Sequence, residues 1–178
     1  IFSNCHLNSL NRKLLYSFIG GYQKDYLTDI RLRIFEMKHP NNTLIKNTGG
    51  WHFNKVVYNK KQSKKGELNE NKTDDEKTTF YNQTLLDSRY SLCPSGTGPN
   101  SIRFWESLAV GSIPILLSDT LDLPKNKLWK ISILRVKEDD VEKIPEILNN
   151  ISLEKENKMR INCIKIYHQY RNNYKFIN

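Results

Sequence analysis

The sequence predicts an α/β protein with an open, mostly parallel sheet and helices on both faces. Short apolar runs bounded by turn residues, such as Lys13–Ile19 and Ile113–Leu117, are typical of buried strands. Segments with helical spacing of apolar residues alternate with these runs, as in Tyr26–Met37. This alternation is typical of parallel sheets that helices cover. The chain of 178 residues is expected to form one domain.

The N-terminal half begins with a strand and a helix. The strand expected over Lys13–Ile19 ends at Gly20 and Gly21, which predict a tight turn. The helix expected over Tyr26–Met37 is followed by Pro40. Further along, weaker patterns predict two short strands, at Leu44–Ile45 and Lys55–Tyr58. An exposed mobile loop rich in Lys, Asn, Glu and Asp is expected over residues 59–77, followed by a helix over Thr78–Leu86.

In the C-terminal half the pattern predicts a strand over Tyr90–Cys93 and a turn over Pro94–Pro99. A helix over Ser101–Val110 and a second strand over Ile113–Leu117 are expected to follow. Gly111 is expected to end the helix, and Pro114 is tolerated near the start of a strand. One or two strands are expected over Trp129–Val136, and a short helix with an awkward internal Pro145 over Asp140–Asn149. A long final helix, which Ser152 caps, is expected over residues 152–174.

Composition excludes several classes of protein. No apolar run approaches the roughly 20 residues that span a bilayer, so we expect no integral membrane segment. The net charge of +9 fits a nucleic-acid surface or solvated lysines, and the scattered lysines favour the second. The three cysteines and four histidines are far apart, which predicts a reducing, cytoplasmic location without disulfides or a metal site. Because the chain starts at Ile1, it also fits a fragment of a longer protein, whose location would stay open.

The turn after the strand at Tyr90–Cys93 has the features of an anion site. Gly96 and Gly98 allow a ligand close to their backbone, and Pro99 stiffens the turn. Asn100 or Ser101 is placed to cap the next helix. The free amides and the positive end of the helix dipole then face a ligand, from Ser101, Ile102 and Arg103. In an open α/β sheet this turn lies at the carboxyl edge, where ligands bind.

Two charged residues follow on the same helix. Arg103 and Glu106 lie at i and i+3, off the face that Ile102, Trp105 and Leu108, with Ala109, are expected to pack on the sheet. Arg103 is near enough to the helix start to pair with a phosphate, and Glu106 is able to accept hydrogen bonds from a sugar diol. The spacing fits equally well a surface ion pair between the two residues.

The segment Cys93–Asp119 reads CPSGTGPNSIRFWESLAVGSIPILLSD. It resembles the signature of the exostosin-type glycosyltransferases, whose pattern runs close to CPRGxGPNSxRFxEALxxGCIPVxxSD. Looser similarity extends to Leu14–Gly20, to Ile30 and Arg31, and to Leu123 and Pro124. The resemblance therefore covers most of the chain in the family's order.

The resemblance implies a Rossmann-like donor domain, the C-terminal half of a two-domain GT-B glycosyltransferase, with the acceptor domain absent from these 178 residues. The donor would be a nucleoside diphosphate sugar, with UDP or GDP favoured, and the acceptor a glycan hydroxyl. No further cofactor and no metal is implied. Donor binding falls on the turn and its surroundings, at Ser95, Gly96, Thr97, Gly98, Pro99, Asn100, Ser101, Arg103, Glu106, Asp119 and Arg31.

Within this set the resemblance gives Arg103 and Glu106 the candidate catalytic positions. Glu106 would hold the ribose, and Arg103 would neutralise the diphosphate or anchor the structure. Asp119 would contact the donor sugar or cap the next turn. The family often has Arg where this chain has Ser95, and Lys24, Arg31 or Arg33 is expected to supply the missing charge. A non-catalytic nucleotide-sugar-binding module or a truncated relic is the main alternative, and a basic nucleic-acid-binding protein is another.

Overall fold

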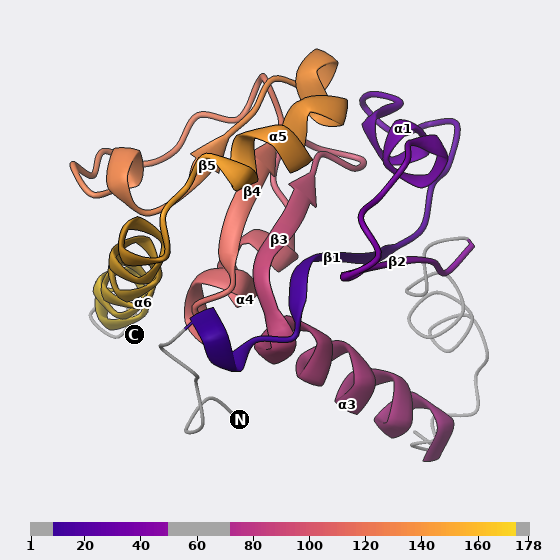
Figure 1. Ribbon diagram of the computed structural model, residues 1–178. Coiled ribbons are helices and arrows are strands. Elements are labelled where there is room, and N and C mark those ends of the chain that lie inside the picture. The colour runs from indigo at the N-terminus through magenta and orange to yellow at the C-terminus, as the bar shows by residue number, and fades with distance from the viewer. Residues whose placement is uncertain (1–8, 50–71, 174–178) are drawn as a thin grey trace, which may run out of the picture.

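The fold is a five-stranded, wholly parallel sheet of order β2-β1-β3-β4-β5 (Figure 1). The structure, a computed structural model, describes residues 9–49 and 72–173. The strands are β1 (Leu14–Gly20), β2 (Thr43–Asn47), β3 (Ser88–Pro94), β4 (Ile113–Leu117) and β5 (Leu134–Arg135). This arrangement confirms the predicted α/β, Rossmann-like class.

The helices form two groups. The first joins α1 (Ile30–Glu36) to η4 (Glu138–Lys143) and α5 (Ile144–Asn149). The second joins α4 (Ile102–Val110) to α3 (Lys72–Asp87) and α6 (Leu153–Asn173). Because parallel crossovers are right-handed, the two groups cover opposite faces of the sheet. Two short turns, η1 (Ser9–Asn11) and η3 (Trp129–Ile131), contact α6, and no helix of the described residues is long and apolar enough to cross a membrane.

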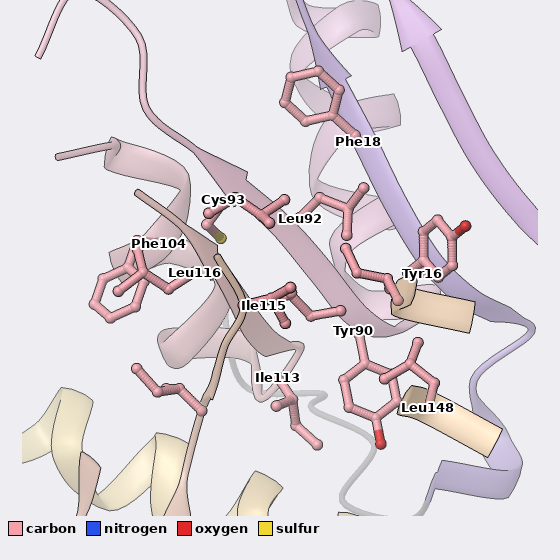
Figure 2. Packing of buried hydrophobic residues seen from close by; sticks show 14 of the residues in the cluster. Tyr16, Phe18, Tyr90, Leu92, Cys93, Phe104, Ile113, Ile115, Leu116 and Leu148 are labelled. Atoms are coloured by element: carbon pink, nitrogen blue, oxygen red, sulfur yellow. The ribbon is translucent and has the colours of Figure 1, made fainter. Parts of the chain in front are cut away.

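The core lies along the central strands. Figure 2 shows Tyr16 of β1, Tyr90 of β3 and Ile115 of β4 among the packed side chains. Tyr16 pairs in register with Tyr90, which in turn pairs with Ile113. Every residue of β4 is buried, as expected for a strand that helices cover on both sides. The apolar runs of the sequence therefore form the strands they predicted.

Local sequence features set several element boundaries. Gly111 ends α4 with φ of 68°, a left-handed conformation that favours glycine. Ser152 accepts a hydrogen bond from the backbone N–H of Lys155 at 3.2 Å, which confirms its role as the cap of α6. Pro145 is not awkward, since it lies in the first turn of α5, where no intrahelical amide bond is lost.

Other boundaries differ from the expectations. The helix predicted from Tyr26 begins only at Ile30, because a turn precedes it. α3 begins at Lys72, inside the segment expected to be a loop, while the rest of that loop and the strand expected at Lys55–Tyr58 lie outside the described residues. Trp129–Val136 forms a 3-10 turn and a two-residue strand rather than longer strands.

The buried face of α4 also differs from the expectation. Leu108 and Ala109 are buried as predicted, but Ile102 is 69% exposed, and the other buried residues are Phe104, Ser107 and Val110. Trp105 packs against Tyr170 of α6, with ring centroids 5.6 Å apart. α6 covers α4, so the helix has two partners and its apolar side is wider than contact with the sheet alone requires.

A buried ion-pair network joins α6 to the rest of the fold. Glu156 and Arg160 are wholly buried and paired at 2.6 Å. Arg89 pairs with Glu156 at 2.5 Å, and the Tyr90 hydroxyl donates to the same carboxylate at 3.1 Å. Arg160 also donates to the carbonyl of Gly111 at the end of α4. The network therefore links α6, β3 and α4 away from the carboxyl edge of the sheet.

Candidate functional site

Strand order locates the ligand edge of the sheet. After β1 the chain passes to β2 on one side, and after β3 it passes to β4 on the other. In open α/β sheets ligands bind outside the carboxyl ends of the strands at such a reversal. The reversal here lies between Gly20, the last residue of β1, and Pro94, the last residue of β3. The glycine turn predicted from the sequence follows β3 directly, so it lies at this point.

Arg31 bridges the two sides of the reversal. Its Nε donates to the carbonyl of Ser95 at 2.7 Å, and its Nη1 donates to the carbonyl of Gly21 at 3.1 Å. Its guanidinium carbon lies 4.8 Å from the ring centroid of Tyr26. Arg31 is one of the basic residues expected to replace the family's turn arginine. The structure places it against the turn itself. Arg33 instead pairs with Asp139 and donates to the backbone of Glu138.

Gly96 makes room for this arginine. A Cβ at Gly96 would lie 2.8 Å from Arg31 Nη2, whereas a Cβ at Gly98 would meet nothing within 4 Å. The Gly96 carbonyl accepts a hydrogen bond from Leu27 at 2.8 Å, which fixes the turn to the segment before α1. A side chain at Gly96 would therefore displace the Arg31 guanidinium, while Gly98 leaves open space beside the backbone that a ligand can approach.

Ser95, the departure from the family pattern, is buried under the turn. Its hydroxyl lies 3.1 Å from the Thr28 hydroxyl and 3.3 Å from Glu138 Oε1. Ser95 therefore contributes structure rather than charge. Its hydroxyl joins the turn to the segment before α1 and to η4, which closes the carboxyl edge on two sides.

The start of α4 leaves its first amides open. Ser101 occupies the cap position but makes no side-chain cap hydrogen bond. Asn100 does not cap the helix either, since its Oδ1 accepts a hydrogen bond from Trp105 Nε1 at 3.3 Å. The amides of Ile102 and Arg103 have no acceptor within the helix, as is general for a first turn. These free donors and the positive end of the helix dipole have the features of an anion site, and they lie beside the turn that Arg31 contacts.

Arg103 is anchored at the end of β1. Its Nη2 donates to the carbonyl of Ile19, and its guanidinium carbon lies 4.6 Å from the ring centroid of Phe18. Its Nε is buried without a hydrogen-bond partner. Arg103 is thus a structural anchor for β1, and it also brings a second half-buried positive group to the strand reversal.

The two arginines affect each other electrostatically. Burial first, and then the nearby charge of Arg103, lower the pKa of Arg31 to about 10. Arg31 remains protonated at neutral pH, and its charge and that of Arg103 repel each other at the strand reversal. A bound anion would relieve this repulsion, which is typical of sites that bind phosphates.

Glu106 does not pair with Arg103. Its Oε2 accepts a hydrogen bond from the Tyr81 hydroxyl of α3 at 2.6 Å. Within the described ranges, no ion pair joins Glu106 to Arg103, so the alternative of a surface ion pair is wrong. Glu106 is half-buried and keeps one carboxylate oxygen, Oε1, without a hydrogen bond to the described part of the protein.

Asp119, just after β4, bonds the start of η4. Its Oδ1 accepts a hydrogen bond from the backbone N–H of Glu138 at 3.3 Å, and its carbonyl accepts one from Arg135 at 3.4 Å. The side chain is exposed at the carboxyl edge. The Asp119 side chain therefore links the end of β4 to η4 rather than capping the turn that follows it, and the donor-sugar contact stays a prediction.

The structure brings most of the predicted site residues to one edge. The contacts above gather four of them at the strand reversal: Ser95, Gly96, Arg31 and Arg103. Beside them, Thr97 is exposed and Pro99 is half-exposed.

Sequence reasoning missed Tyr81 and Glu138. Tyr81 lies at the centre of a weakly patterned helix, and no local pattern indicated a role for it. Within residues 9–49 and 72–173, no group of three or more His, Cys, Asp or Glu side chains gathers as a metal site.

Fold and site together define the class of protein: a doubly wound α/β domain with two arginines and the start of a helix at its carboxyl edge. Comparison with known proteins agrees with it. The exostosin GT47 domain model matches residues 5–151, which is well over half of the chain. The chain belongs to the exostosin GT47 family of glycosyltransferases.

Relatives in several organisms share the matched region. An exostosin-1 homolog of Caenorhabditis elegans is 32% identical over 92 residues, covering 51% of this chain and 24% of that protein. Exostosin-1 of Drosophila melanogaster is 33% identical over 95 residues, covering 50% and 12%. A probable glucuronoxylan glucuronosyltransferase of Arabidopsis thaliana, IRX7, is 35% identical over 74 residues, covering 40% and 16%. The aligned part of the chain thus spans less than a quarter of each of these relatives.

Proposed function

We propose that this chain forms the donor-binding part of a glycosyltransferase. The donor is a nucleoside diphosphate sugar, and the reaction moves the sugar to a hydroxyl group of a glycan acceptor. The observation that carries the proposal is the pair of half-buried arginines, Arg31 and Arg103, beside open helix amides at the strand reversal. These groups match two adjacent phosphates in charge and in hydrogen-bond donors.

In this proposal the chain's own groups stabilise the leaving diphosphate. As the bond from the sugar carbon to the phosphate oxygen breaks, negative charge grows on the diphosphate. Fixed donors that already point at this charge lower the barrier without reorganising. The amides at the start of α4 supply such donors, while Arg31 and Arg103, which their bonds to backbone carbonyls hold in place, supply fixed positive charge. The names of the plant relatives make a glucuronosyl group the first sugar to test.

The binding step is tested by a thermal-shift panel without added metal. A ligand that binds only the native state raises its stability, by about 2.7 kcal/mol at a hundredfold excess over its dissociation constant. We expect UDP or GDP to raise the melting temperature and the free nucleoside to do so far less, since it lacks the diphosphate. Unchanged melting temperatures with millimolar nucleoside diphosphates of every base would refute donor binding.

Glu106 is proposed to hold the ribose of the donor. If its carboxylate accepts hydrogen bonds from the ribose hydroxyls, Glu106→Ala should weaken nucleotide binding by about 1.5 to 3 kcal/mol. The same substitution should leave the affinity for the 2′,3′-dideoxy analogue nearly unchanged, because that ligand lacks the hydroxyls. Calorimetric titration of both proteins with both ligands measures the difference.

The comparison of the two ligands separates this role from general damage to the site. Glu106→Ala also removes the acceptor of the Tyr81 hydroxyl, so some loss common to both ligands would have a structural origin. Equal losses for the ribose and dideoxyribose ligands would rule out the ribose contact. The diphosphate half of the proposal would then stand alone.

A further inference from the structure

Tyr81 contacts both charged residues of α4. Its hydroxyl donates to Glu106 Oε2 at 2.6 Å, and its ring centroid lies 5.9 Å from the guanidinium carbon of Arg103. Tyr81 belongs to α3, which precedes β3 in the chain, so it reaches the site from a different element than the glycine turn. The side chain is half-buried.

The position of Tyr81 explains why Arg103 and Glu106 remain apart. Opposite charges three residues apart on a helix usually pair. Here Arg103 turns toward β1, where it bonds the Ile19 carbonyl and lies on the Phe18 ring. Glu106 turns toward α3, where the Tyr81 hydroxyl holds it. Both charges therefore remain directed to separate places at the site instead of neutralising each other.

We infer that Tyr81 is a positioning residue, which holds the Glu106 carboxylate so that Oε1 accepts a hydroxyl of a ligand's vicinal diol. The inference rests on the proposed function, since the diol is the ribose of the donor. With Oε2 occupied by a tyrosine, the carboxylate has one orientation before ligand binds, which reduces the entropy lost on binding. Affinity for the diol thus depends on a residue that never touches it.

Burial supports this role for the tyrosine. It raises the pKa of Tyr81, and the Glu106 carboxylate raises it further, against an opposing effect of Arg103. The hydroxyl therefore stays protonated, and able to donate, throughout the neutral and mildly alkaline range.

The test is calorimetric titration of Tyr81→Phe with UDP or GDP, whichever the wild-type protein binds more tightly, and with its 2′,3′-dideoxy analogue. Loss of one hydrogen bond to a carboxylate predicts about tenfold weaker binding of the ribose ligand. Binding of the dideoxy ligand should not change. Tyr90→Phe is the matched control, because it removes a tyrosine–glutamate bond from the Glu156 network instead. It should change neither affinity.

The double variant Tyr81→Phe/Glu106→Gln adds a measurement that a merely structural role would not satisfy. If Tyr81 acts through Glu106, the losses of the two single variants should not add. Additive losses, equal losses for both ligands, or an unchanged ribose affinity in folded Tyr81→Phe would each overturn the inference and leave donor binding intact. A wild-type protein that binds neither ligand would overturn both.

Discussion

Glu156→Ala is expected to destabilise the fold by about 3 to 5 kcal/mol, the usual cost of removing one partner from a buried ion pair. Glu156 is wholly buried, and its carboxylate is shared by Arg89 and Arg160. Its removal leaves Arg160, also wholly buried, without a counter-charge. Denaturant unfolding monitored by circular dichroism measures the loss.

The same helix supplies a matched control. Glu154 pairs with Lys158 at the same i, i+4 spacing as Glu156 with Arg160, but both side chains are largely exposed. Glu154→Ala should change the unfolding free energy little, since solvent screens an exposed pair. A similar effect of the two substitutions would show that the buried network does not stabilise the fold as described.

The network also predicts acid sensitivity. Burial alone would raise the pKa of Glu156, but the hydrogen bond from Arg89 and the charge of Arg160 hold it below its ordinary value. A depressed carboxyl pKa contributes stability above the unfolded-state value of about 4.3, and this stability is lost as pH falls through the folded-state value. The Glu156→Gln protein should be less stable overall, and its free energy of unfolding should depend less on pH below about 4.3 than that of the wild-type protein.

Arg31→Ala is expected to weaken nucleoside diphosphate binding by about 2 to 5 kcal/mol, the usual loss when one partner of a hydrogen-bonded charge pair between protein and ligand is truncated. The substitution removes a charge and also leaves the Ser95 and Gly21 carbonyls without their donor. Arg31→Lys should bind with intermediate affinity, since the ammonium keeps the charge but not the two-sided hydrogen bonding. Titration with the diphosphate and with the free nucleoside separates the phosphate contribution.

Arg33→Ala is the control for this prediction. Arg33 lies two residues along the same helix and contacts Glu138 and Asp139 rather than the turn. The Arg33→Ala protein should bind the diphosphate with nearly unchanged affinity. A loss in Arg33→Ala as large as in Arg31→Ala would mean that the overall charge of α1, rather than the position of Arg31, determines binding.

Much of the fold was predictable because burial and turn chemistry determine it locally. The run Ile113–Leu117 has no polar residue and becomes a strand buried throughout. Gly111 ends α4 because its backbone has a positive φ. The position of the glycine turn at the carboxyl edge followed from the strand that precedes it.

The contacts between distant elements were not predictable in the same way. Arg31 comes to the turn because α1 packs beside β3's carboxyl end, and the sequence alone offered Lys24 and Arg33 as equal candidates. Tyr81 meets Glu106 across two helices that no periodicity links. The outward position of Ile102 depends on α6 covering α4, which the pattern within α4 does not encode.

The measurement that tests donor binding most directly is an NMR titration of the wild-type protein with a nucleoside diphosphate, with each backbone amide followed separately. If the diphosphate binds at the strand reversal, the largest shifts should fall on the turn and the helix start, at Gly98, Ile102 and Arg103, because their amides face the open side of the site. Saturating diphosphate that leaves these amides unchanged, or that shifts amides of α6 instead, would contradict the proposed site.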